Sequence, residues 1–128
     1  MEDGVTPIRV VLADDDELYV TSLAELIEQQ PELTVVGIAR NGIEAIDFAE
    51  QLDPEAIVID LHMPRLDGVS AIARLRGDHP TMCLIALTGD PSTTLKQAVT
   101  EAGADAVLHK SEMLGALVDR LATVRSPG

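Results

Sequence analysis

The sequence predicts an α/β fold in which a doubly wound sheet of five parallel strands carries helices on both faces. Its 128 residues are the length of one domain. Five short, nearly continuous apolar runs, typical of strands buried on both faces, alternate with segments of helical periodicity. Because crossovers between parallel strands are right-handed, this alternation gives an open sheet, commonly in strand order 2-1-3-4-5. The functional crevice of such a sheet lies at the carboxyl ends of strands 1 and 3.

The predicted strands are mostly rich in Val, Ile and Leu and cover residues 8–13, 33–39, 56–60, 82–87 and 106–108. Helices are expected over residues 17–29, 42–52 and 69–76, each between two strands. Two later segments repeat apolar residues at the spacing of one helix face: Leu95, Ala98, Val99 and Ala102 in the first, and Leu114, Leu117, Val118 and Leu121 in the second. We expect Ala98, Val99 and Ala102 to pack on the sheet rather than on a partner.

Capping residues support these helix limits. A side-chain oxygen just before a helix satisfies one of its unpaired N–H groups, and a glycine just after a helix favours its termination. Asn41 with Glu44 has the spacing of a capping box. The other expected signals are Asp16 and Asp67 as N-caps, Asp90 before Pro91 at a first helical position, and Gly103 after the fourth helix.

Charge and composition argue against several classes of function. The chain holds 22 acidic and 9 basic residues, a formal net charge of −13, which disfavours direct binding to nucleic acid or to an acidic membrane surface. The single cysteine, Cys83, excludes an internal disulfide, and its apolar neighbours predict a buried, unreactive thiol. The acidic first residues precede no long apolar stretch, so we expect neither a signal peptide nor a membrane helix, and a cytoplasmic location.

Charged and polar residues stand where the predicted strands end. An acidic run at residues 14–16 follows the first strand, Asp60 ends the third, Thr88 follows the fourth, and Lys110 lies just beyond the fifth. Because the carboxyl ends of parallel strands meet at one edge, we expect three carboxylates, one hydroxyl and one ammonium to converge there. Each residue alone also fits an ordinary cap, turn or surface position, but their shared placement favours a site.

The expected chemistry of this edge is phosphoryl transfer. Carboxylates packed together repel one another unless a cation is present, and oxygen-only ligands favour Mg²⁺ or Mn²⁺ over zinc. A bound ion would accept one phosphoryl oxygen, Lys110 would neutralise a second, and Thr88 would donate a hydrogen bond to a third. Asp60 is then left as a carboxylate nucleophile that forms an acyl phosphate.

Other chemistries fit these residues less well. The turn after the first strand lacks the glycines that would cradle a dinucleotide or a nucleotide phosphate. No serine or cysteine nucleophile with a partner base is apparent in the sequence. His62, two residues after Asp60, is expected to be a solvent-facing loop residue, and His79 is expected in another loop.

The chain resembles the receiver domains of two-component response regulators over about residues 8–124. The matching segments are Val-Leu-Ala-Asp-Asp-Asp (11–16), Ile-Val-Ile-Asp-Leu-His-Met-Pro-Arg-Leu-Asp-Gly (57–68), Ile-Ala-Leu-Thr-Gly (85–89) and Val-Leu-His-Lys-Ser (107–111). The Asp-x-x-Met-Pro-x-x-Asp-Gly pattern is very specific when an acidic pair lies upstream and Thr and Lys lie downstream. The Lys-Ser pair and residues 31–41 are similar to the NarL/LuxR-type branch, whose output is a helix-turn-helix DNA-binding domain.

The resemblance implies a flavodoxin-like receiver fold and a role for each site residue. Asp60 would accept a phosphoryl group from a sensor histidine kinase, and Thr88 and Lys110 would grip that group. The Mg²⁺ ligands would be Asp14, Asp15, Asp60 and the backbone carbonyl of His62. Phosphorylation would shift a conformational equilibrium at the face of the fourth helix, fifth strand and fifth helix, where a homodimer is also expected. Such a domain is a switch with limited enzymatic character, since it only assists its own phosphorylation and dephosphorylation.

Two positions depart from the pattern that is common in this family. Val107 stands three residues before Lys110, where receivers often carry Tyr or Phe, so no ring at that position can follow a movement of Thr88. Ser111 follows Lys110, where many receivers have a proline. Residues 125–128 resemble the start of a linker, so we expect residues 1–128 to be the single receiver domain of a longer transcription regulator rather than a stand-alone receiver.

Two other classes of function stay open. An aspartyl phosphatase of the haloacid-dehalogenase type also uses a carboxylate nucleophile, and Asp14 with Asp16 has its Asp-x-Asp spacing, although the other motifs and a cap domain are absent. A degenerate receiver that acts as a phosphate-independent interaction module is the alternative that Val107 favours. Turnover of phosphate esters would indicate the phosphatase, and partner binding unchanged by phosphorylation would indicate the interaction module.

Overall fold

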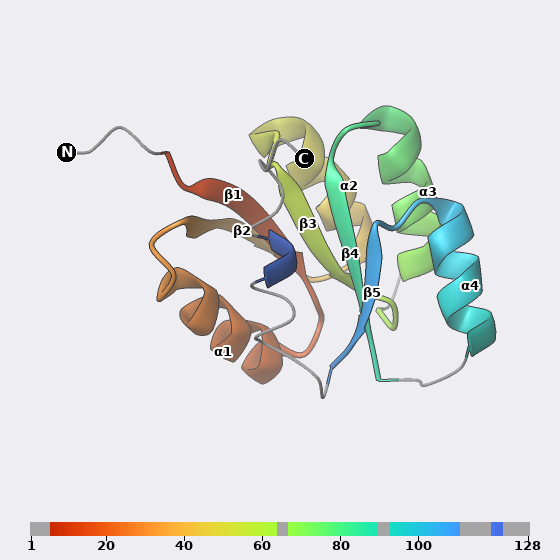
Figure 1. Ribbon diagram of the computed structural model, residues 1–128, viewed down its shortest axis with the longest axis horizontal. Helices are drawn as coiled ribbons and strands as arrows, with labels where there is room; N and C mark the ends of the chain where they lie inside the picture. Colours follow the sequence, from red (N-terminus) through yellow and green to blue (C-terminus); the bar gives the residue numbers. More distant parts are fainter. Residues whose placement is uncertain (1–5, 64–66, 90–92, 111–118, 122–128) are drawn as a thin grey trace.

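The computed structural model describes residues 6–63, 67–89, 93–110 and 119–121, and its five parallel strands form one sheet in the order β2-β1-β3-β4-β5 (Figure 1). The strands are β1 (Ile8–Ala13), β2 (Leu33–Ala39), β3 (Ala56–Asp60), β4 (Cys83–Thr88) and β5 (Ala106–His109). The predicted fold class and strand order are confirmed. Strands β4 and β5 each end one residue later than predicted, because Thr88 pairs with His109 at the edge of the sheet.

Four helices connect the strands: α1 (Glu17–Glu28), α2 (Gly42–Leu52), α3 (Gly68–Asp78) and α4 (Thr93–Ala102). Their caps follow the sequence closely, since Asp16, Asn41 and Asp67 each accept an N–H three residues ahead. The capping box differs in one detail, because the Glu44 carboxylate accepts the N–H of Arg40 rather than that of the cap residue. Gly103 ends α4 with a φ of +124°, as predicted.

The predicted fifth helix lies mostly outside the described residues, and so does the expected start signal at Asp90 and Pro91. Residues 119–121 are helical, and Leu121 among them is fully buried. In the part of the chain that the structure describes, no helix is long and apolar enough to cross a membrane.

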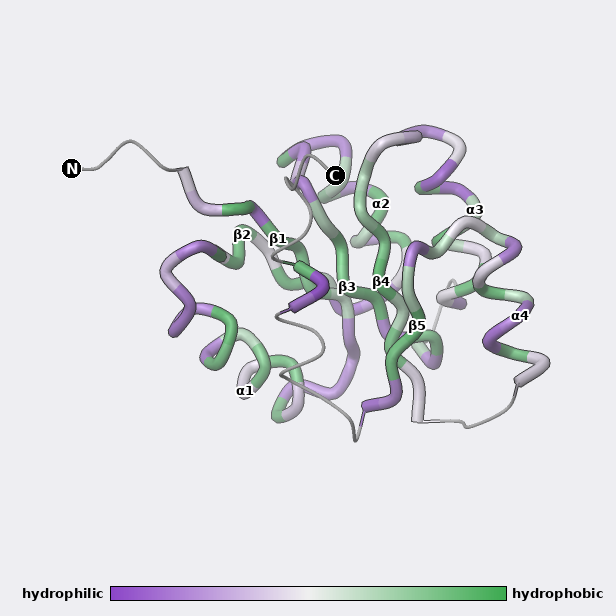
Figure 2. Tube along the Cα trace, in the orientation of Figure 1, coloured by the Kyte–Doolittle hydropathy of each residue, from purple (hydrophilic) through white to green (hydrophobic). Residues whose placement is uncertain are grey.

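Alternate residues of each strand point to opposite faces of the sheet, so the core has two layers. Figure 2 shows that the central strands are mostly hydrophobic along their length. On one face Val11, Ile57 and Leu84 pack against α2, α3 and α4. On the other face Val10 and Val58 pack against α1 and Leu121, and Figure 1 shows α1 on the side opposite α3 and α4. This double burial is why the strand sequences are nearly continuous apolar runs rather than alternating ones.

Two expectations about burial need correction. Val99 is fully buried and Ala102 packs on the same core, but Ala98 is exposed. The reason is that α4 covers the margin of the sheet beside β5, where the buried stripe of the helix is narrow and Ala98 lies at its border. Cys83 is partly rather than fully buried, and burial raises the pKa of its thiol, which supports the expected low reactivity.

Candidate functional site

The carboxyl-terminal edge of the sheet brings together the residues predicted to form a site. Asp60 is the last residue of β3, which lies between β1 and β4 in the sheet. Asp14 follows β1 directly, and its N–H donates to the carbonyl of Ala39 at the end of β2 (3.0 Å). Thr88 ends β4, and its carbonyl accepts the N–H of Lys110 (2.8 Å). Positions up to 96 residues apart in the chain therefore meet at one edge.

Three carboxylates form the centre of this edge. One oxygen each of Asp14, Asp15 and Asp60 lie within 4.8 Å of one another. Asp14 and Asp60 are only 2% and 3% exposed, whereas Asp15 faces solvent. Carboxylate oxygens are the ligand type that Mg²⁺ prefers, so these three residues could hold such an ion once their oxygens draw slightly closer, to the spacing of about 4.2 Å between opposite ligands.

Lys110 is the counter-ion of the two buried carboxylates. Its Nζ donates to Oδ2 of Asp14 (3.0 Å) and to Oδ2 of Asp60 (3.1 Å). The other oxygens also have donors: the N–H of Asp16 reaches Asp14 (2.9 Å), and the N–H of His62 reaches Asp60 (3.0 Å). One ammonium, in contact with two of the carboxylates, thus accompanies a cluster of three, so the cluster keeps an excess of negative charge.

The pKa values of two groups reflect this imbalance. Burial raises the pKa of Asp14 above its usual value, opposed by the hydrogen bonds from the Asp16 N–H and Lys110, while the neighbouring Asp60 raises it further. Burial alone would lower the pKa of Lys110, but the contacts with Asp14 and Asp60 outweigh it and raise the pKa above that of a free lysine. The lysine is therefore firmly protonated, whereas the charged form of Asp14 is disfavoured.

Thr88 is buried at the edge, and its hydroxyl already has a neighbour. The Nε2 atom of the His62 ring lies 3.1 Å from Oγ1 of Thr88. His62 is exposed, as the sequence predicts, but its ring contacts a site residue, which the sequence does not predict. No pattern in the sequence indicates this contact, because the two residues are 26 positions apart and lie near the ends of different strands.

Gly68 holds α3 tightly against the chain that leaves Asp60. A Cβ at this position would lie 2.5 Å from the Cα of Leu61 and 2.9 Å from the carbonyl oxygen of Asp60. Asp67, just before it, caps α3 by accepting hydrogen bonds from the N–H and hydroxyl of Ser70. The Asp-Gly pair of the motif therefore serves to set the start of α3 beside Asp60.

Tyr19 is a neighbour of the site that the sequence reasoning missed. The Nζ of Lys110 lies 4.5 Å from the centroid of its ring. The available signal was the position of the chain's single tyrosine in the first helix, five residues after Asp14.

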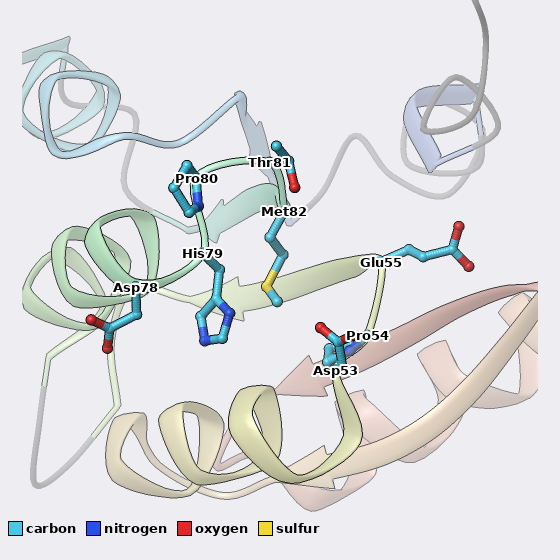
Figure 3. A pocket seen from close by; sticks show the side chains of 8 residues that line it. All are labelled: Asp53, Pro54, Glu55, Asp78, His79, Pro80, Thr81 and Met82. Carbon is cyan, nitrogen blue, oxygen red and sulfur yellow. The ribbon is translucent and has the colours of Figure 1, made fainter.

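A hollow of about 460 Å³ lies away from this site, at the amino-terminal edge of the sheet (Figure 3). The loops before β3 and β4 form it, and the side chain of His79 points into it. His79 is the C-cap of α3, at the loop position that the sequence predicts. None of the three clustered carboxylates lines this hollow, so it is separate from the candidate site. Its lining residues are Asp53, Pro54, Glu55, Asp78, His79, Pro80, Thr81 and Met82.

Comparisons with known proteins agree with this geometry. Residues 10–122 match the family described as response regulator receiver domain. The response regulator domain of Thermotoga maritima CheB superposes with a TM-score of 0.86 at 25% identity, over 93% of this chain and 96% of that one. The receiver domain of the putative response regulator NarL from Mycobacterium tuberculosis superposes with a TM-score of 0.83, over 91% of this chain and 97% of that one. At 22% identity, this similarity shows the shared fold.

The curated relatives include an enzyme and a transcriptional regulator. A protein-glutamate methylesterase/protein-glutamine glutaminase of Myxococcus xanthus is 38% identical over 107 residues, which cover 81% of this chain and 30% of that protein. The transcriptional regulatory protein LnrK of Bacillus subtilis is 31% identical over 121 residues, which cover 94% of this chain and 55% of LnrK. This chain thus spans about a third to a half of these relatives, and the part it shares with both is the receiver.

Proposed function

Since this chain belongs to the response regulator receiver domain family, we propose that it is a switch in which Asp60 accepts a phosphoryl group from the phosphohistidine of a sensor histidine kinase. The observation that carries the proposal is Lys110, whose ammonium joins Asp60 to Asp14 within a cluster of three carboxylates. A structural ion pair would need one carboxylate, so the surplus of acids favours a site that takes up further positive charge. Residues 8–124 would form the receiver core.

The proposed reaction is an in-line displacement at phosphorus. A carboxylate oxygen of Asp60 forms a bond to phosphorus while the bond from phosphorus to the imidazole nitrogen of the kinase breaks, and that nitrogen keeps the electron pair. Mg²⁺ held by Asp14, Asp15, Asp60 and the carbonyl of His62 would supply charge neutralisation to the phosphoryl oxygens. The product is an acyl phosphate on Asp60.

Lys110 and Thr88 would then change partners. Phosphorylation removes the negative charge of the Asp60 carboxylate and places new negative charge on the phosphoryl oxygens. The Lys110 ammonium would follow this charge from Asp60 to a phosphoryl oxygen. The Thr88 hydroxyl would leave the His62 ring and donate to a second phosphoryl oxygen. With Val107 in place of an aromatic residue, the movement of Thr88 would be read out by backbone and loop changes rather than by a ring at that position.

The output and the setting belong to the same proposal. LnrK, which aligns with nearly the whole chain, supports transcription regulation through a DNA-binding domain outside these residues, while this acidic domain would not itself contact DNA. The 38% identity to a methylesterase supports an enzymatic output domain as the second candidate. We place the protein in the cytoplasm beside its kinase, with a homodimer through α4, β5 and the predicted fifth helix.

Intact mass spectrometry after incubation with Mg²⁺ and acetyl phosphate tests the chemistry. We expect one phosphoryl adduct on the wild-type chain and none on Asp60→Asn. Asp16→Asn is the matched control, because it lies two residues from Asp14, keeps a capping side chain and is outside the carboxylate cluster. An adduct that persists in Asp60→Asn would contradict the assignment. Failure of the wild type with both acetyl phosphate and a purified histidine kinase would favour a phosphate-independent interaction module.

A further inference from the structure

Tyr19 lies beside Lys110 at the carboxyl-terminal edge of the sheet but has no part in the reaction as proposed above. Its ring centroid is 4.5 Å from the Nζ of Lys110, well inside the range of about 6 Å in which a cation is attracted to the face of an aromatic ring. The ammonium of Lys110 therefore has three neighbours: the carboxylates of Asp14 and Asp60, and this ring.

The ring is held in place by the same acidic run that forms the site. Asp16 accepts the backbone N–H of Tyr19 (3.1 Å), and Asp14 accepts the backbone N–H of Asp16 (2.9 Å). Asp14 in turn accepts a hydrogen bond from Lys110 (3.0 Å), whose nitrogen faces the Tyr19 ring. These four contacts form a closed circuit, so the first turn of α1 fixes where the lysine nitrogen sits.

The hydroxyl of Tyr19 does not explain the position of the ring. It is buried and has no hydrogen-bond partner among the residues that the structure describes. Burial also raises the pKa of Tyr19, which keeps the hydroxyl neutral. A buried hydroxyl without a partner lowers stability, so the favourable contribution of this side chain comes from its ring.

We propose that Tyr19 is a positioning residue for phosphoryl transfer, whose ring keeps the Lys110 ammonium in the site while the nitrogen moves from the carboxylates to the phosphoryl group. The attraction of a ring face is broad in direction, so it persists while the nitrogen shifts its hydrogen bonds. A third carboxylate at this place would hold the lysine more tightly but would compete with the phosphoryl oxygens. This inference rests on the proposed function of Asp60 and Lys110.

The test compares Tyr19→Leu with Tyr19→Phe in the full chain. The leucine variant removes the ring and keeps an apolar side chain, whereas the phenylalanine variant keeps the ring and removes only the unpartnered hydroxyl. We measure the rate of adduct formation on Asp60 from acetyl phosphate in Mg²⁺. We expect Tyr19→Leu to be about three- to tenfold slower, the range that the loss of one cation–π contact implies. Tyr19→Phe should stay within about twofold of the wild type and be at least as stable.

A spectroscopic measurement separates positioning from a general effect on folding. Protons on the carbon next to Nζ of Lys110 should be shifted upfield by the ring current in the wild type and in Tyr19→Phe, and should lose that shift in Tyr19→Leu. If Tyr19→Leu fails to fold, Tyr19→Met replaces it, with the same expected loss.

Three outcomes would overturn the inference: a wild-type rate in the leucine or methionine variant, a phenylalanine variant as slow as leucine, or no ring-current shift in the wild type. Absence of any adduct on the wild type would instead show that the proposed function of Asp60 fails.

Discussion

The two edges of the sheet each hold a partly buried cation, and the two cations have opposite surroundings. At the carboxyl-terminal edge Lys110 faces a surplus of carboxylates, two of them buried. At the amino-terminal edge the guanidinium of Arg76 donates to the carbonyls of Gly103 (2.9 Å), Pro80 (2.8 Å) and Met82 (2.8 Å) and to the carboxylate of Asp105 (2.7 Å).

The two edges differ in how well the charge of the cation is balanced. Arg76 joins the end of α3, the start of β4 and the turn after α4, and one carboxylate balances its charge. That carboxylate, on Asp105, also accepts the N–H of Leu84 (2.8 Å). The Lys110 edge is unbalanced, because one ammonium accompanies three carboxylates, and burial and the nearby Asp60 both raise the pKa of Asp14. The balanced cation and the surplus of acids thus lie at opposite ends of the same strands.

The largest expected effect on stability comes from removing the balanced cation. Arg76→Met should lower the free energy of unfolding by about 3 kcal/mol, because several carbonyls and a carboxylate lose their charged donor. Arg74→Met on the same helix is the control. Its side chain is 61% exposed and forms a surface ion pair with Asp78, so we expect a change below about 0.5 kcal/mol. Urea denaturation measures both.

The rate at which the Asp60 adduct forms tests whether the two edges are independent. In folded Arg76→Met the adduct should form at the wild-type rate, since Arg76 lies at the opposite edge from the carboxylates. A large loss of the phosphorylation rate without a loss of stability would show that the two edges are coupled. It would contradict the expectation that Arg76 contributes to stability alone.

The next largest effect on stability is expected from adding Mg²⁺, which would offset the excess negative charge of the carboxylate cluster. Mg²⁺ at 100 times its dissociation constant should stabilise the wild type by about 2.7 kcal/mol, because it binds the folded cluster and not the unfolded chain. Asp15→Asn should remove most of this gain, since Asp15 contributes an exposed ligand oxygen. Asp47→Asn, an exposed acid of α2 outside the cluster, is the matched control. Equal stabilisation of all three proteins by Mg²⁺ would exclude a specific site at these carboxylates.

The smallest expected effect concerns how stability depends on pH in the presence of EDTA. The charges of Asp67 and Asp14 should contribute to the free energy of unfolding with opposite signs. The pKa of Asp67 is lowered, chiefly by the N–H of Ser70, so its contribution is present above pH 3.8 and is lost as the pH falls through the folded pKa. It should amount to a few tenths of a kcal/mol because Asp67 is exposed and screened. The raised pKa of Asp14 means that its charge destabilises the folded state at neutral pH, and this cost diminishes as the pH falls through the folded pKa.

Asp67→Asn and Asp14→Asn test these signs against the wild type. Relative to the wild type, Asp67→Asn should be less stable at neutral pH and should recover below pH 3.8. Asp14→Asn should be more stable at neutral pH, and its advantage should shrink on acidification. Parallel pH curves for the two variants, measured by thermal unfolding, would contradict the contrast between a solvated cap and a buried, crowded carboxylate.

Much of the fold was predictable because its signals are local or depend on simple patterns. The first three strands have the predicted bounds, and the caps at Asp16, Asn41 and Asp67 are as predicted. The convergence of Asp14, Asp60 and Lys110 followed from strand order, since parallel strands of a doubly wound sheet end at one edge. The exposed Ala98 was not predictable, because its burial depends on how far α4 reaches over the sheet.

The sequence by itself determined the sheet, its order and the set of charged and polar groups at the strand ends, because hydrophobic periodicity and residue type act along the chain. Only the tertiary structure decided which neighbours those groups have. The ring of Tyr19 beside Lys110, the ring of His62 on Thr88 and the carbonyls around Arg76 join residues that are not neighbours along the chain. The physical reason is that such contacts depend on distances of a few ångströms set by packing, which no pattern along the chain specifies.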